Sequence, residues 1–102
     1  MFARVSVYQE SPEGMDESIR NWEDVIARVN QGLEAEGIAG KGAMLLVERK
    51  SGKSMTISFW NSEEDMRSSA EVANKARSEA TEASGGHIVS VEEFEVALDD
   101  RG

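Results

Sequence analysis

The chain has 102 residues, with 20 acidic and 11 basic side chains, a formal net charge of -9 and no cysteine. This length fits one domain, and the lack of cysteine excludes disulfides, thiol chemistry and cysteine metal sites. The acidic balance argues against nucleic-acid binding because it repels phosphate, and no apolar run approaches the length that spans a membrane. The first ten residues lack a basic start followed by an apolar stretch, so we expect no signal peptide and a cytoplasmic protein.

The segment FARVSVY (2–8) alternates with the period of a β-strand. Its two alternating sets are Ala3, Val5 and Val7 on one side and Arg4, Ser6 and Tyr8 on the other. ESPEG then forms a turn that carries the only proline of the chain.

Apolar residues next recur at steps of three and four, which predicts an amphipathic helix from about residue 15 to about residue 33. Its stripe consists of Met15, Ile19, Trp22, Ile26, Val29 and Leu33. Trp22 therefore belongs to the core and is a candidate wall of a pocket. The segment EAEGIAGKGA that follows contains three glycines and is predicted to be a connection.

Two apolar runs, AMLLVER and SMTISFW, flank Ser51-Gly52 and predict a β-hairpin. A helical pattern then extends from Ser62, a candidate N-cap, to about residue 84, with a break near 68–71. The apolar face of this segment is small: Ala70, Ala73, Ala76, Ala80 and Ala83. The helix is predicted to end at the glycines of SGG. The last strand is predicted over HIVSVEEFEVAL. We expect a single domain over 1–98 with a loose acidic tail at 99–102.

The order β-α-β-β-α-β predicts a ferredoxin-like α+β fold, with a four-stranded antiparallel sheet and both helices on one face. Both alternating sets of the hairpin strands contain apolar residues, as with Leu45 and Leu46. A sheet with one solvated face should alternate more cleanly. We therefore expect a second copy of the chain to cover the other face, giving a homodimer.

The segment GKGAMLLVERKSGKSMTISFWNSEEDMRSS, together with SVEEFEV near the end, resembles the antibiotic biosynthesis monooxygenase domain, a branch of the dimeric α+β barrel proteins. The resemblance covers nearly the whole chain and rests mainly on structural signatures. It implies homodimers with facing sheets and a small-molecule pocket between each sheet and its own helices. Members include cofactor-free oxygenases of aromatic polyketides and quinols, haem-degrading enzymes and isomerases.

The haem-degrading members use a histidine on the second helix, a pocket tryptophan and a strand-one asparagine. The second helical segment here has no histidine, and Ser69 and Ser6 lie near the other two positions. We therefore expect no haem. We also expect no metal and no other cofactor, because a zinc or haem site would rest on one histidine and no cysteine.

His87, the only histidine, starts the last strand and is a candidate general base, although an ordinary strand-end role is the simpler interpretation. Arg77 and Asn74 lie one turn apart beside the alanine stripe. Arg77 is a candidate holder of a substrate anion, or equally a surface residue paired with Glu79 or Glu82. Acidic clusters such as Glu63-Glu64-Asp65 are better explained as solvated charge than as a cation site.

Trp60 ends its strand where the chain leaves the sheet, so we expect its indole to fill the seam between sheet and helices while its N–H finds a partner.

Two functions of the protein remain open. The first is a cofactor-independent monooxygenase acting on an aromatic, quinol or polyketide-like molecule, with pocket residues drawn from Tyr8, Trp22, Trp60, Met66, Asn74, Arg77 and His87. The second is a non-catalytic small-molecule-binding or stress-response protein on the same scaffold, which a pocket filled by Trp22, Met66 and Phe59 would favour.

Overall fold

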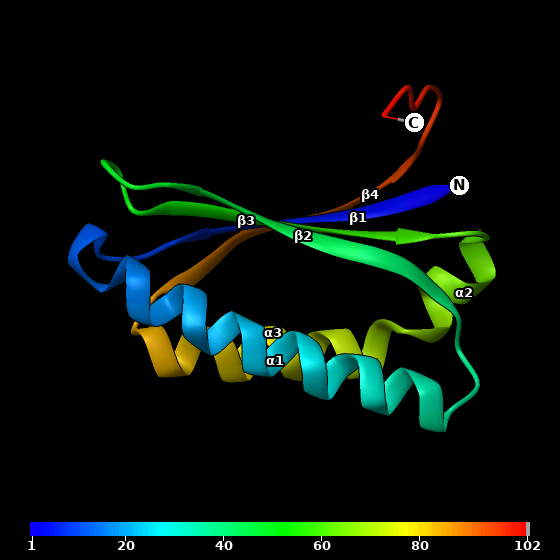
Figure 1. The fold of residues 1–102 in the computed structure, drawn as a ribbon, viewed down its shortest axis with the longest axis horizontal. Coiled ribbons are helices and arrows are strands. Elements are labelled where there is room, and N and C mark those ends of the chain that lie inside the picture. The colour runs from blue at the N-terminus through cyan, green and yellow to red at the C-terminus, as the bar shows by residue number, and fades with distance from the viewer. Residues whose placement is uncertain (102) are drawn as a thin grey trace.

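The computed structural model describes residues 1–101, which form one sheet and one layer of helices (Figure 1). The elements are β1 (Phe2–Gln9), the 3-10 turn η1 (Pro12–Gly14), α1 (Met15–Ala35), β2 (Gly40–Glu48), β3 (Lys53–Trp60), α2 (Glu63–Ser68), α3 (Ala70–Ser84) and β4 (His87–Glu95). The strands are ordered β2-β3-β1-β4 and all neighbours are antiparallel. Both long helices lie beneath the same face, so the predicted ferredoxin-like fold is confirmed.

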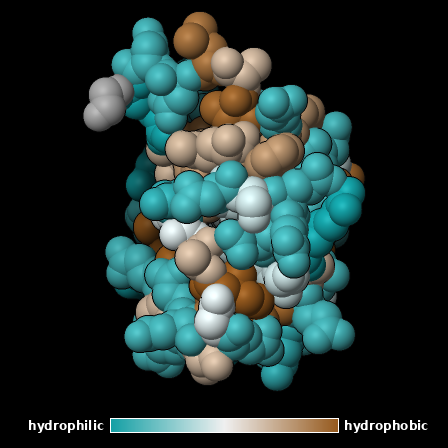
Figure 2. Space-filling view, turned by 90° about the vertical axis from the view of Figure 1, so that its right-hand side faces the viewer, coloured by the Kyte–Doolittle hydropathy of each residue, from teal (hydrophilic) through white to brown (hydrophobic). Residues whose placement is uncertain are grey.

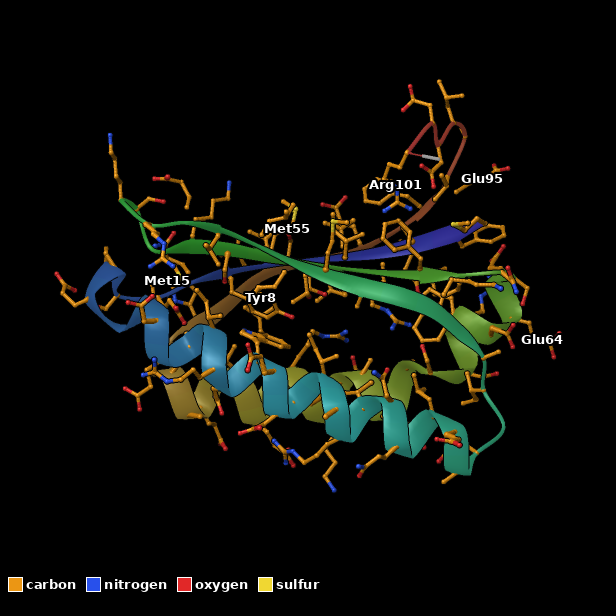
Figure 3. All side chains as sticks on the ribbon, in the orientation of Figure 1. Tyr8, Met15, Met55, Glu64, Glu95 and Arg101 are labelled. Carbon is orange, nitrogen blue, oxygen red and sulfur yellow. The ribbon has the colours of Figure 1, made fainter. Side chains whose placement is uncertain are left out.

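The polar residues of β1 and β3 lie on the face of the sheet that the helices cover, which is the reverse of the usual arrangement. β1 pairs Arg4 with Ser58, Ser6 with Thr56 and Tyr8 with Ser54, and residues directly opposite one another share a face. Tyr8 points toward the helices, whereas Met55 points away from them (Figure 3). The polar alternating sets of β1 and β3 therefore face the helices, and the apolar sets face outward.

The outward face is apolar over β1, β2 and β3 and at the Phe94 end of β4, whereas further along β4 presents Glu92 and Ser90 on it. The register places on it Ala3, Val5 and Val7 of β1, Met44 and Leu46 of β2, Met55, Ile57 and Phe59 of β3, and Phe94 of β4. Leu46 and Phe94 remain 46% and 48% exposed in the single chain. We call this set of residues the outer sheet face. It accounts for the apolar residues in both alternating sets of the hairpin strands.

The core between sheet and helices consists of two clusters rather than one. Tyr8, Trp22, Val25 and Ala80 form the first, in which the Tyr8 and Trp22 rings lie 5.2 Å apart between centroids at a tilt of 53°. Leu33, Trp60 and Met66 form the second. Separate clusters leave space between them, and that space is the candidate site.

The predicted break in the second helical segment is confirmed and lies at Ser69. Ser62 begins α2 by accepting a hydrogen bond on Oγ from the Asp65 amide, at 3.1 Å, as its capping role predicts. Ser69 is fully buried between α2 and α3 and donates from Oγ to the Met66 carbonyl at 2.6 Å. Gly85, in the left-handed region at φ 72°, ends α3.

The glycine-rich segment 40–42 was expected to be a connection, and this expectation is wrong, because β2 begins at Gly40. Gly40 pairs with Trp60, and a Cβ there would lie 3.5 Å from the indole ring. The register shifts between Gly40 and Ala43, and Gly42 has φ 100°, so the glycines allow a bulge beneath the tryptophan. Periodicity alone does not reveal such a pairing.

The C-terminal segment lies over one end of the outer sheet face (Figures 1 and 3). The Arg101 guanidinium carbon lies 4.5 Å from the centroid of the Phe59 ring, and the same side chain donates to both carboxylate oxygens of Asp99. β4 ends at Glu95, three residues before the predicted end of the strand. The expected loose tail, 99–102, ends with a residue outside the described range.

Candidate functional site

A cavity of about 440 Å³ lies between the sheet and the two long helices. This volume is within the range of small-molecule pockets, roughly 300–1,000 Å³. The walls are mainly apolar and include Val25, Val29 and Leu33 of α1, Ile38, and Ala73 and Ala76 of α3. Ala73 and Ala76 belong to the small apolar face that the sequence shows for this helical segment, and here they border the cavity.

The cavity opens between α1 and β2. Its solvent-exposed lining residues come from these two elements: Asn30 and Glu34 of α1, and Gly40, Gly42 and Ala43 of β2. Figure 2 views the end of the molecule at which α1 leads into β2, and it shows apolar surface between hydrophilic residues there. A ligand can therefore enter without unfolding either layer.

Arg4 of β1 is a buried cation at the cavity wall, only 3% exposed. It donates from Nη1 to Ser69 Oγ at 3.1 Å and from Nη2 to the Met66 carbonyl at 2.6 Å. Its guanidinium also contacts the Glu93 carboxylate of β4, at 3.5 Å, and its guanidinium carbon lies 5.8 Å from the Trp60 ring centroid. Burial lowers the pKa of Arg4, and the nearby Glu93 carboxylate partly offsets this.

Arg77 of α3 is the second buried cation of the cavity, 8% exposed. Among the described residues its side chain makes one hydrogen bond, from Nη2 to Asn74 Oδ1. Burial lowers the pKa of Arg77, and the charge of Arg4 acts in the same direction, whereas Tyr8 and Glu93 partly offset the lowering. The alternative of a surface ion pair with Glu79 or Glu82 is wrong, because Arg77 is buried and, among the described residues, forms an ion pair with neither; Glu79 pairs instead with Arg28 at 3.0 Å.

Tyr8 completes the polar part of the cavity and is 3% exposed. Its hydroxyl lies 3.1 Å from Thr56 Oγ1, and either oxygen can be the donor. Burial raises the pKa of Tyr8, although the hydrogen bonds to Thr56 and Ser6 and the charges of Arg77 and Arg4 act in the opposite direction. The phenol is therefore protonated near neutral pH and acts as a hydrogen-bond partner rather than a base.

Four of the predicted site residues line this one cavity: Tyr8, Trp22, Trp60 and Arg77. Met66 is buried against Trp60 in the second core cluster, outside the lining. Asn74 is exposed and contacts the site only through Arg77. His87 is exposed at the start of β4 and is not part of the lining.

Arg4 and Ser69 are site residues that we did not predict from the sequence. The available signal was the match between two polar alternations, Arg4-x-Ser6-x-Tyr8 in β1 and Ser54-x-Thr56-x-Ser58 in β3. Polar sets on neighbouring strands that share one face indicate that this face surrounds something other than a hydrophobic core. The sequence does not show which face the helices cover.

Trp60 packs in the seam between sheet and helices and also borders the cavity. Its Nε1 donates to Ser58 Oγ at 3.0 Å, its ring packs against the second core cluster, and one side borders the cavity. The expected packing in the seam, with a partner for the indole N–H, is therefore confirmed.

We predict that Trp60→Phe lowers the free energy of unfolding by about 1–2 kcal/mol, because the smaller ring leaves a gap above Gly40 and Ser58 loses its donor. Urea unfolding of both proteins measures the difference. Phe59→Leu, a change on the outward side of the same strand, serves as a control for general strand sensitivity. An unchanged stability for Trp60→Phe would contradict the packing role.

The chain resembles known proteins in its fold. No protein-family model matches the chain. The structure superposes on a crystal structure of an antibiotic biosynthesis monooxygenase with a TM-score of 0.65, at 13% identity, covering 96% of this chain and all of the other. A candidate antibiotic biosynthesis monooxygenase from Deinococcus radiodurans gives 0.63, at 13% identity and full coverage of both chains. The chain has the fold of these monooxygenases.

Other relatives agree with this fold and add no activity. A dimeric ferredoxin-like protein from an uncultured marine organism gives a TM-score of 0.59 at 9% identity, covering 99% of this chain and 93% of the other. Two strains of Mycobacterium tuberculosis have uncharacterized proteins, MT2634 and Rv2557, that are each 33% identical to this chain over 97 residues. The match spans 95% of this chain but 41% of theirs. The monooxygenase-like fold is thus established by structure, while the reaction is a separate question.

Within residues 1–101, no group of three or more His, Asp or Glu side chains is arranged to hold a metal ion. Over the same residues, no helix has the length and apolar character needed to cross a membrane.

Proposed function

We propose that the protein is a homodimer whose cavity binds an electron-rich phenol or quinol and oxidises it without a cofactor. The observation that carries this proposal is the cavity itself: an apolar space of about 440 Å³ into which two buried arginines and a tyrosine project. A mostly apolar pocket with a few convergent polar groups is typical of a small-molecule site. The shared fold with antibiotic biosynthesis monooxygenases supports the same reaction class.

The proposed reaction draws its electrons from the substrate. A phenolate with a hydrogen on the carbon para to its oxygen reacts with one O₂. A new C–O bond forms at that carbon, the O–O bond breaks, and the ring becomes a quinone. The displaced hydrogen leaves with the second oxygen atom as hydroxide. The ring loses four electrons and O₂ gains four, so no flavin, haem or metal enters the balance.

The cavity residues would assist this reaction by stabilising charge. Arg77 and Arg4 favour the phenolate over the phenol, and a buried cation is worth more in a cavity that excludes water. The Tyr8 hydroxyl can donate to an oxygen of the substrate. Trp22 and Trp60 supply flat walls against which an aromatic ring can lie. His87 is not needed in this scheme.

A specific observation keeps the non-catalytic alternative open. Among residues 1–101, the only carboxylate of the cavity lining is Glu34 at the mouth, and the lining includes no histidine. A cavity with donors and cations but no buried base is also suited to holding a small molecule unchanged. Trp22 borders the cavity but does not fill it, Phe59 belongs to the outer sheet face, and Met66 lies outside the lining, so the filled pocket that would favour this alternative is not the arrangement observed.

Oxygen uptake separates the two functions. We expect the purified protein to accelerate O₂ consumption by at least one member of a panel of naphthols and polyphenols that carry a hydrogen para to a hydroxyl group, and ¹⁸O₂ to place one labelled atom in the product. Arg77→Met should reduce that rate by about a hundredfold, as expected for loss of a donor to a developing anion. Heat-denatured protein controls for autoxidation. Binding of panel members without any acceleration would support the alternative function.

Dimerisation is the second part of the proposal and rests on the outer sheet face. A contiguous apolar face of this kind is typical of an interaction surface, and a second copy covers it by two-fold symmetry. The dimeric ferredoxin-like relative supports this arrangement.

A further inference from the structure

We infer that the cavity selects ligands that are already anions in solution, with a flat apolar body and one carboxylate or acidic enolate oxygen group held between Arg4 and Arg77. This inference rests on the proposed small-molecule site and names the class of ligand that the site prefers. Carboxylates and enolates share the chemistry that matters here, a delocalised negative charge on oxygen.

The first argument is the charge balance at the cavity. Arg4 and Arg77 are both buried, and within the described residues the one carboxylate that contacts either of them is that of Glu93, at 3.5 Å from Arg4. The Glu93 side chain is 46% exposed, so water weakens its effect. Glu34 lies at the solvent-exposed mouth. Two buried positive charges thus face one partly solvated negative charge, in a protein whose overall charge is -9.

The second argument is the unused hydrogen-bonding capacity of Arg77. A guanidinium has five N–H groups, and within residues 1–101 this side chain uses one of them, toward Asn74. Arg4, by contrast, has partners in Ser69, the Met66 carbonyl and Glu93. Arg77 is therefore the residue with capacity to bind a planar oxygen pair, for which a guanidinium is well shaped. Arg4 adds charge from a position that α2 and Ser69 hold in place.

The third argument is the absence of a base in the cavity. Tyr8 stays protonated at neutral pH because burial raises its pKa, and Glu34 is the only acidic residue of the lining in the described part of the chain. A ligand that must lose a proton after entry would find no buried acceptor for it. A ligand that enters ionised needs none, and the apolar walls then bind its ring system.

Two matched pairs of probes test this preference by isothermal titration calorimetry at pH 7.5. The first pair is 2-naphthoate and 2-naphthamide, which share their ring system and differ in charge. The second pair is 2-hydroxy-1,4-naphthoquinone, an ionised enol at this pH, and uncharged 2-methyl-1,4-naphthoquinone. We expect the anion of at least one pair to bind at least about tenfold more tightly than its neutral partner, and the pair that shows this identifies carboxylate or enolate as the preferred group.

Three variants connect the preference to the two arginines. Arg77→Met should remove the difference between anion and neutral analogue, while Glu93→Gln should strengthen anion binding by about threefold because a competing carboxylate is lost. Arg49→Met is the matched control, since Arg49 is an exposed arginine whose partner is Asp16, away from the cavity lining. The two tryptophans of the chain both line the cavity, so quenching of their fluorescence reports independently that the probe is bound there.

The inference is overturned if neutral analogues bind as tightly as anions, if no probe binds, or if Arg77→Met keeps the preference. Its failure is distinct from failure of the proposed reaction. Preferential anion binding without O₂ uptake would contradict the proposed oxygenase reaction and would still support the inferred class of ligand. Turnover of an uncharged quinol at a rate that Arg77→Met does not change would contradict the ligand class and the role of Arg77, and it would still support oxygenase activity.

Discussion

Replacing Gly52 with alanine is expected to lower the free energy of unfolding by about 4 kcal/mol, a large part of the stability of a domain of this size. Gly52 has φ 78°, a conformation that costs residues with a Cβ about 1–2 kcal/mol. An added Cβ would also overlap the carbonyl oxygen of Glu10 and lie 3.1 Å from the Pro12 nitrogen. Both neighbours are backbone atoms, so no side chain can rotate away.

The position of Gly52 explains why this turn cannot simply relax. The Glu10 amide donates to the Gly52 carbonyl at 3.0 Å, which joins the β2–β3 turn to the end of β1. Moving the turn would break this hydrogen bond and disturb the register of β1 with β3. The expected melting temperature is lower by about 15–30 °C, from the usual 4–8 °C per kcal/mol in a chain of this length.

Gly37→Ala is the matched control for this effect. Gly37 has φ 71°, but a Cβ there would meet nothing within 4 Å. The control therefore includes the backbone strain without the overlap, and we expect a loss of about 1 kcal/mol. Equal losses of melting temperature in the two variants would show that the contact with Glu10 does not matter.

Met55→Asp is expected to convert the proposed dimer into a monomer. Met55 points away from the helices, within the outer sheet face, between Val7 and Leu46 on the neighbouring strands (Figure 3). In a two-fold dimer each substitution occurs twice, so two carboxylates lose water without a partner. At about 2 kcal/mol for each, the dimer weakens by about 4 kcal/mol, or about a thousandfold in Kd.

Light scattering at micromolar concentration measures this change directly. The parent protein should give about twice the chain mass of 11.2 kDa, and Met55→Asp should give the mass of one chain. Ser78→Asp introduces the same charge at an exposed position of α3, on the helix layer, and should leave the dimer intact. A parent protein that is monomeric and well folded under these conditions would contradict the proposed homodimer.

The amino-acid sequence by itself determined the elements and their order. The 3.6-residue period of α1, the alternation in β1, the Ser62 cap and the glycine turns each act over a few residues, so local physical chemistry is sufficient to predict them. The break between α2 and α3 was predicted for the same reason. The bulge at Gly40–Gly42 was missed because it depends on Trp60, twenty residues further along the chain.

Only the tertiary structure decided which side of the sheet the helices cover. Alternation divides Arg4, Ser6 and Tyr8 from Ala3, Val5 and Val7, but it does not show that the polar set lies inside. That assignment depends on where α1 and α3 cross the sheet, which is a property of the whole fold. It buries Arg4 beside Arg77, residues 73 positions apart, and it leaves His87 outside the cavity. Charge and spacing along a chain do not reveal such a juxtaposition, because burial changes what an arginine can do only after the layers have packed.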